Sequence, residues 1–150
     1  MNPGHFAALG LISLLTLAPA LASAADGVTV AAAGKPAATK HRAVFQVNED
    51  DSRKWNTVLA NINNVQEELG QVEIAVVVIG PGLGMLKADA LTANKVQDAM
   101  SAGVRFVACG NSMQALHLTK DDMIDGIAYA KAGYVEVMRL QQLGYAYIRP

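Results

Sequence analysis

The sequence predicts an α/β fold in which helices cover both faces of a mainly parallel sheet. Short apolar runs alternate with helical patterns from residue 42 to residue 150. Such an alternation is typical of consecutive βα units, whose strands lie parallel in one sheet. The run at residues 72–79 (VEIAVVVI) is apolar on both faces in its second half. This pattern indicates a central strand that is buried from both sides.

The first helix has the clearest boundaries in the sequence. It follows a strand expected at residues 42–47, and either Asp50 or Asp51 offers its N-cap. Gly70 ends the helix. Its apolar residues recur at helical spacing, so we expect one stripe to pack on the sheet. The stripe contains Trp55, Val58, Leu59, Ile62, Val65 and Leu69.

The remaining elements follow in the same alternating order. After the strand at 72–79, we expect strands at residues 104–108, 127–130 and 145–148. Helices are predicted at 93–102 and 133–142, with a short helical piece at 113–118 and a capping box at 119–122. In the last helix we expect Tyr134, Val137 and Met138 to face inward.

The first 24 residues differ in composition from the rest of the chain. They contain none of its 12 basic and 13 acidic residues. Their apolar stretch, residues 6–17, is too short to span a bilayer, and Ala-Ser-Ala at 22–24 resembles a cleavage site. We expect a cleaved signal peptide at 1–24, a flexible linker at 25–41 and a domain at 42–150. The mature protein would be periplasmic or secreted, with no stable membrane insertion after cleavage; an uncleaved anchor is the alternative.

Charge and residue spacing exclude several kinds of partner. The formal net charge is −1, whereas a nucleic-acid-binding protein presents a basic face. No paired Cys and His spacing predicts a metal site. We therefore expect no nucleic acid, no metal and no cofactor.

The single cysteine, Cys109, is the candidate catalytic residue. It ends a predicted strand, and ligands of open parallel sheets bind outside the carboxyl ends of the strands. A thiol near a helix N-terminus has a lowered pKa, because the backbone N–H groups stabilise the thiolate. Gly110 lets the chain turn beside the sulfur, and Asn111 or Ser112 offers a hydrogen bond. The alternative is that Cys109 is a small buried apolar residue.

Four further residues are candidates for the rim of this site. Asn48 follows the first strand, and Gly80 and Gly82 follow the second in a segment that is either a plain turn or an anion-binding nest. The sequence favours the plain turn, which would still leave space for a small ligand. His117 is either a base for the thiol or a surface histidine, and the surface position is favoured.

Several segments together resemble one protein family. They are residues 44–51, 72–74, 80–82, 103–113 (GVRFVACGNSM) and 144–150. The chain from 44 to 150 resembles the DsrE/DsrF-like family, whose better-known members act in sulfur oxidation and sulfur relay. The resemblance implies a three-layer α/β/α sandwich on a five-stranded, mainly parallel sheet and assembly into homo- or hetero-oligomers. It also implies that Cys109 matches the family cysteine that carries a persulfide.

Three functions follow from these observations. The favoured one is a periplasmic sulfur carrier that acts through Cys109, forms a homo-oligomer and works with a sulfur donor or acceptor protein. It would transfer sulfur and is not expected to be a turnover enzyme. The first alternative is a non-catalytic oligomeric module that binds a small ligand or a partner, with Cys109 structural. The second is a redox-sensing thiol that forms an intermolecular disulfide, ranked last because the chain has no second cysteine.

Overall fold

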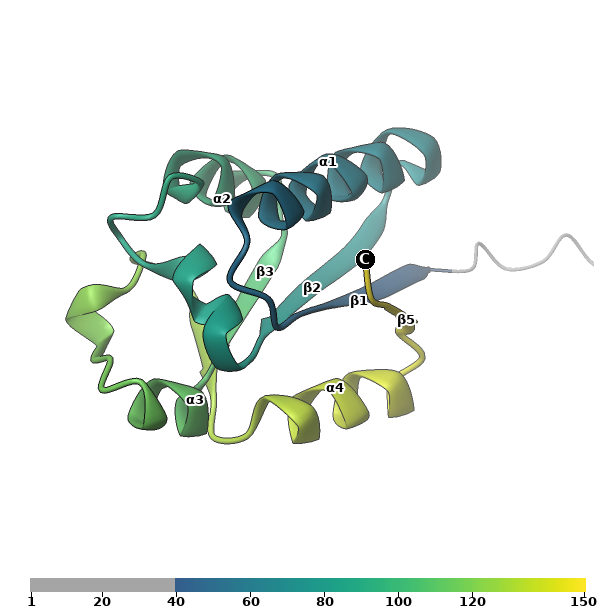
Figure 1. Cartoon of the computed structure of the whole chain (residues 1–150). Helices are drawn as coiled ribbons and strands as arrows, with labels where there is room; N and C mark the ends of the chain where they lie inside the picture. Colours follow the sequence, from purple (N-terminus) through teal and green to yellow (C-terminus); the bar gives the residue numbers. More distant parts are fainter. Residues whose placement is uncertain (1–39) are drawn as a thin grey trace, which may run out of the picture. The chain divides into compact units, whose positions relative to one another are not determined.

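The computed structural model describes residues 40–150, so the predicted signal peptide and most of the predicted linker lie outside the described residues. These residues form a five-stranded sheet in the order β4-β3-β2-β1-β5, and every neighbouring pair is parallel (Figure 1). The sheet confirms the predicted fold class. Its strands are β1 (His41–Val47), β2 (Val72–Val78), β3 (Arg105–Cys109), β4 (Ala128–Ala130) and β5 (Ala146–Ile148).

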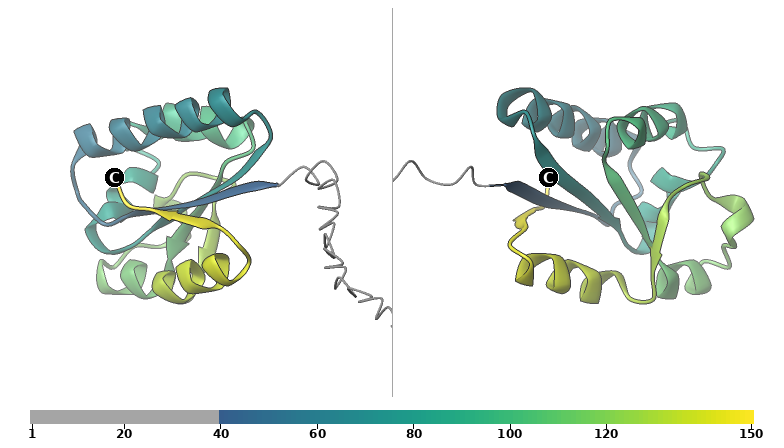
Figure 2. Two further views of the ribbon diagram at one scale, coloured as in Figure 1. Left: turned by 90° about the vertical axis from the view of Figure 1, so that its right-hand side faces the viewer. Right: turned by 180° about the vertical axis from the view of Figure 1, so that it is seen from behind.

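Helices cover both faces of the sheet, which makes the three layers. Figures 1 and 2 show α1 (Ser52–Leu69) and α2 (Ala93–Ser101) on one face and α4 (Gly133–Gln142) on the other. The short helix α3 (Gly110–Ala115) follows β3 at once. Two 3-10 helices, η1 (Gly80–Leu86) and η2 (Lys120–Asp122), lie in the connections after β2 and α3.

The sheet separates two apolar cores, because successive strand residues point to opposite faces. Val76 and Val78 of β2 belong to the core under α1 and α2, together with Ile62 of α1. Val77 belongs to the core under α4, together with Val137. All three β2 valines are fully buried. This double burial explains why the sequence of β2 is apolar at every position near its end.

Local sequence signals fix the ends of several elements. Asp51 is the N-cap of α1, where its carboxylate accepts a hydrogen bond from the Arg53 N–H at 2.9 Å. Gly70 ends the helix with φ 68°. Thr119 and Asp122 form the predicted capping box, at the start of η2. These three predictions are confirmed.

Two local predictions are wrong. The helical piece predicted at residues 113–118 instead begins at Gly110 and ends at Ala115, so residues 110–112 are the first turn of α3 and not a turn before it. In α4, Tyr134 and Met138 are 56% and 58% exposed, and the helix instead buries Leu140 and Glu136 beside Val137. Its packing face includes Glu136, a largely buried carboxylate whose ion pairs with the partly exposed Arg105 and Arg139 are not detected by apolar periodicity.

Among residues 40–150, none of the helices is both long enough and apolar enough to cross a bilayer.

Gly82 fixes η1 against the end of β1. Its N–H donates to the Asn48 carbonyl at 2.9 Å, and a Cβ at Gly82 would lie 2.8 Å from the Val47 carbonyl oxygen. The obstacle is backbone, so a larger side chain would have to displace η1. Gly82 therefore has a packing role in this fold.

We expect Gly82→Ala to lower the free energy of unfolding by about 1–3 kcal/mol, because the added methyl group overlaps the β1 backbone. Urea unfolding followed by circular dichroism measures the change. Leu91→Ala is the control, since Leu91 is 90% exposed and its loss should cost less than about 0.5 kcal/mol. Equal effects of the two substitutions would contradict this packing role.

Candidate active site

The site lies where the chain leaves β3 and β4 at the carboxyl edge of the sheet. Cys109 ends β3 and pairs in register with Ala130, which ends β4. After β3 the chain enters α3, whose Met113 joins the core shared with α1 and α2. After β4 it enters α4, whose Val137 joins the opposite core. The start of α3 and the start of α4 lie side by side there (Figure 1), and the crevice between them is at the carboxyl ends of the strands, the usual ligand position in such sheets.

Cys109 lies at the base of this crevice and is held by the start of α4. The thiol is only 4% exposed, and its Sγ accepts a hydrogen bond from the Gly133 N–H at 3.2 Å. A Cβ at Gly133 would lie 2.6 Å from Ile79 Cγ1 and 3.1 Å from Cys109 Cβ. Glycine at this position lets the backbone N–H reach the sulfur.

The surroundings of Cys109 favour its thiolate form. Burial raises the pKa of the thiol, but hydrogen bonds from the Ser112 hydroxyl and from the N–H groups of Gly133, Ser112 and Asn111 lower it. The net effect is a pKa below the ordinary value for cysteine. Because the thiolate is the nucleophile, a lowered pKa increases its fraction at neutral pH.

The predicted supporting residues join the segments around the thiol. The Ser112 hydroxyl accepts a hydrogen bond from the Gly80 N–H at 2.8 Å, which ties α3 to η1. The Asn111 N–H donates to the Lys131 carbonyl at 3.0 Å, which ties α3 to the β4–α4 connection. Gly110 packs beside that connection, where a Cβ would lie 3.4 Å from the Ala130 carbonyl oxygen.

A cavity of about 320 Å³ opens beside Cys109. Its wall is mostly apolar and comes from the end of β2, the start of η1, α3 and the start of α4. The lining residues are Ile79, Gly80, Pro81, Cys109, Asn111, Ser112, Ala115, Leu116, Ala132, Gly133 and Tyr134. A cavity of this size admits a small molecule or one side chain of a partner, so the buried sulfur has a route to a reactant.

The predicted rim residues have different positions. Gly80 lines the cavity. Asn48 does not line it, but its Nδ2 donates a hydrogen bond at 3.0 Å to the hydroxyl of Tyr134, which does. Gly82 packs on β1. His117 is exposed in the turn after α3, with φ 54°, and is not among the lining residues, so the structure does not bring it to the thiol.

Comparison with known proteins identifies the family. The model of the DsrE/DsrF-like family matches residues 28–150, well over half of the chain. The chain belongs to the DsrE/DsrF-like family. This membership confirms the predicted resemblance, and at the level of the family it supports a protein of the sulfur-relay type. No protein of curated function matches the chain significantly.

Solved structures of similar proteins agree with the fold of this DsrE/DsrF-like protein. The protein MTH1491 from Methanobacterium thermoautotrophicum, described as of unknown function, is 33% identical with a TM-score of 0.72, over 74% of this chain and 100% of that one. BT1422 from Bacteroides thetaiotaomicron, also of unknown function, is 11% identical with a TM-score of 0.62, over 73% and 94%. The ychN protein from E. coli is 12% identical with a TM-score of 0.60, over 74% and 99%. The latter two indicate a shared fold alone.

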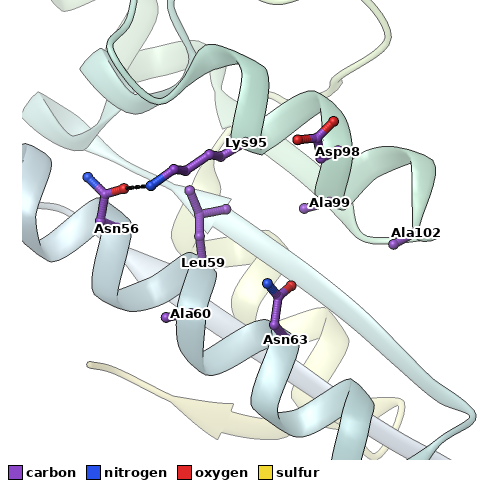
Figure 3. A pocket seen from close by; sticks show the side chains of 8 residues that line it. All are labelled: Asn56, Leu59, Ala60, Asn63, Lys95, Asp98, Ala99 and Ala102. Atoms are coloured by element: carbon purple, nitrogen blue, oxygen red, sulfur yellow. Dashed lines mark hydrogen bonds between the residues drawn. The ribbon is translucent and has the colours of Figure 1, made fainter.

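A second cavity lies between α1 and α2 (Figure 3). Its volume is also about 320 Å³, and across it the Lys95 ammonium donates a hydrogen bond to Asn56 Oδ1 at 2.5 Å. Asn63 and Asp98 also contribute polar groups, but the lining contains neither a thiol nor an imidazole. In the part of the chain that the structure describes, no group of three or more His, Cys, Asp or Glu side chains is placed to hold a metal ion.

Sequence reasoning missed the contribution of α4 to the site. The sequence predicts Gly133 as the start of the last helix and Tyr134 on its core-facing side, and neither residue at the ligand site. One signal could have found them. They follow the fourth strand closely, and the carboxyl ends of all parallel strands meet at one edge of the sheet.

We expect Ser112→Ala to slow alkylation of native Cys109 by iodoacetamide at neutral pH by about threefold to tenfold, because a hydrogen bond that stabilises the thiolate is lost. The rate is measured by intact mass, and Cys109 is the one thiol in the sequence. The matched control is Ser101→Ala, which removes an exposed helix hydroxyl bonded to the Gln97 carbonyl and should leave the rate unchanged. A Ser112→Ala rate equal to that of the wild type would contradict the role given to Ser112.

Proposed function

We propose that this DsrE/DsrF-like protein is a sulfur carrier in which Cys109 accepts a sulfane sulfur and passes it to an acceptor thiol. The observation that carries the proposal is the convergence of hydrogen-bond donors on a thiol that lines a small cavity. Donors that stabilise a thiolate also stabilise the terminal sulfur of a persulfide when it carries the negative charge.

Loading of Cys109 needs no external oxidant when the donor is a hydropolysulfide ion, HSn⁻. The thiolate attacks one sulfur of the chain, a new S–S bond forms, and an S–S bond of the polysulfide breaks. The shortened ion, HS(n−1)⁻, leaves with the electron pair and the proton. Cys109 then carries a deprotonated persulfide, and the polysulfide has been reduced by the two electrons that the thiolate supplied.

Release reverses the roles of the two sulfur atoms. An acceptor thiolate attacks the outer sulfur of protonated Cys109 persulfide, and the S–S bond to Cys109 breaks. The acceptor becomes a persulfide, and Cys109 leaves as a thiolate. The donors that lower the pKa of Cys109 make it a better leaving group, so the same contacts assist both steps.

The proposal includes the setting in which the carrier works. We propose that residues 1–24 direct export to the periplasm and that a donor or acceptor protein exchanges sulfur with Cys109. We also propose a homo-oligomer. Exposed apolar side chains on α4, from Tyr134, Val135 and Met138, support this assembly, because adjacent exposed apolar groups commonly mark protein contacts.

One observation favours a second candidate function. Cys109 is 4% exposed, as a cysteine that only fills space would be. In that case the protein is a binding module, and the cavity holds a ligand or a partner's side chain without sulfur chemistry. Reactivity of the folded thiol distinguishes the two candidates.

We expect the purified mature protein, exposed to polysulfide, to gain one or more sulfur atoms that a reductant removes. Intact-mass analysis measures the gain. Cys109→Ser should show none while its circular dichroism stays that of the wild type, because the hydroxyl cannot form a persulfide. A wild-type mass that does not change, with a thiol that is alkylated only after denaturation, would exclude the carrier and leave the binding module.

A further inference from the structure

A chain of hydrogen-bonded side chains crosses the sheet edge and ends at the cavity beside Cys109. It begins at Tyr147 of β5, passes through Gln46 of β1 and Asn48 after β1, and ends at Tyr134 of α4. Gln46 is 5% exposed, and a buried amide is costly unless its hydrogen bonds are made. This series of hydrogen bonds satisfies both the oxygen and the nitrogen of the Gln46 side-chain amide.

Every link of the chain donates in the same direction. The Tyr147 hydroxyl donates to Gln46 Oε1 at 2.9 Å, and Gln46 Nε2 donates to Asn48 Oδ1 at 2.8 Å. Asn48 Nδ2 then donates to the Tyr134 hydroxyl at 3.0 Å. Hydrogen bonds aligned in series polarise one another, so each donor strengthens the next.

The Tyr134 hydroxyl accepts this hydrogen bond, so its own proton remains available for a second hydrogen bond. Among residues 40–150, the bond from Asn48 is the one hydrogen bond made by this hydroxyl, and it uses the oxygen as acceptor. Tyr134 lines the Cys109 cavity. The same lining contains no Lys, Arg, Asp or Glu. Any charged reactant that enters must be recognised by hydrogen bonds, and an O–H donor favours a negative charge.

We propose that Tyr134 is a specificity-determining residue whose hydroxyl binds the negatively charged group of a small anionic reactant at Cys109. In terms of the proposed function, on which this assignment of substrate class rests, the sulfur donor is then a small anion such as a hydropolysulfide. The chain from Tyr147 orients the hydroxyl by occupying its acceptor side. Asn48 and Gln46 act through Tyr134 as positioning residues.

A pair of alkylating reagents isolates the effect of charge. Iodoacetate and iodoacetamide have nearly the same size and react with the same thiolate, but one is an anion and the other is neutral. A hydrogen bond to an ionised group is roughly twice as strong as one between neutral groups. Removing the hydroxyl should therefore slow iodoacetate more than iodoacetamide.

The experiment compares the ratio of the two second-order rate constants in the full chain and its variants. We expect Tyr134→Phe to lower the iodoacetate to iodoacetamide ratio by about fivefold. Tyr147→Phe, which removes the first donor far from the cavity, should lower the ratio by a smaller factor. Tyr129→Phe is the control, because Tyr129 is a partly exposed tyrosine that does not line this cavity, and its ratio should equal that of the wild type.

Two results would overturn the proposal: an unchanged ratio in Tyr134→Phe, even if both reagents react more slowly, or a native thiol that reacts with neither reagent. Exposure of the wild type to polysulfide separates this proposal from the carrier function. A protein that gains no sulfur but shows the fall in ratio keeps Tyr134 as the residue that recognises an anion and loses the carrier role. A protein that gains sulfur with an unchanged ratio keeps the carrier role and loses Tyr134 as its specificity residue.

Discussion

The site depends on the close approach of the start of α4 to the end of β3. The Gly133 N–H reaches Cys109 Sγ at 3.2 Å, and no side chain larger than hydrogen fits between the helix and Ile79. A second contact holds the same two elements together. Arg105, at the other end of β3, donates to the buried Glu136 of α4 at 3.0 Å. The helix is thus joined to β3 at both ends of the strand, and its first N–H is fixed beside the thiol.

Two of the three buried polar or charged side chains among residues 40–150, Gln46 and Glu136, take part in hydrogen-bonded networks that include α4. Glu136 is held by Arg105 and by Arg139, and Gln46 is satisfied by Tyr147 and Asn48. Buried polar groups stabilise a fold only when they are fully bonded, and each then specifies one arrangement of its neighbours. Here the contacts of Glu136 set the position of α4 relative to β3. The hydrogen bonds that run from Gln46 of β1 through Asn48 set the position of the Tyr134 hydroxyl. The apolar cores alone would tolerate small shifts of α4 against the sheet, and these polar contacts exclude such shifts.

The sequence was sufficient to place Cys109 at the end of a strand on the carboxyl edge of the sheet, because strand periodicity and the rule for parallel sheets depend on local signals. It was not sufficient for α4. Glu136 is buried because it pairs with Arg105, which lies 31 residues away in the sequence. The pattern of apolar positions does not reveal a pair of this kind. A separation of 24 residues in the sequence likewise hid the contact between Gly133 and Cys109, which requires β4 to lie next to β3. His117 lies near the cysteine in sequence but not in the lining of its cavity, since the chain turns away after α3.

The reactivity proposed for Cys109 depends on one balance, in which hydrogen-bond donors around the sulfur outweigh the cost of burying its thiolate. Titration of the thiolate by ultraviolet absorbance, in the native protein and in urea, measures that balance directly. We expect the native midpoint to lie at lower pH than the unfolded one, because the pKa of the folded thiol is lowered. The stabilisation from this group is then complete above the unfolded pKa and is lost as pH falls through the folded pKa. A native midpoint at or above that of the unfolded chain would contradict the account, since burial would then dominate and Cys109 would be a space-filling residue.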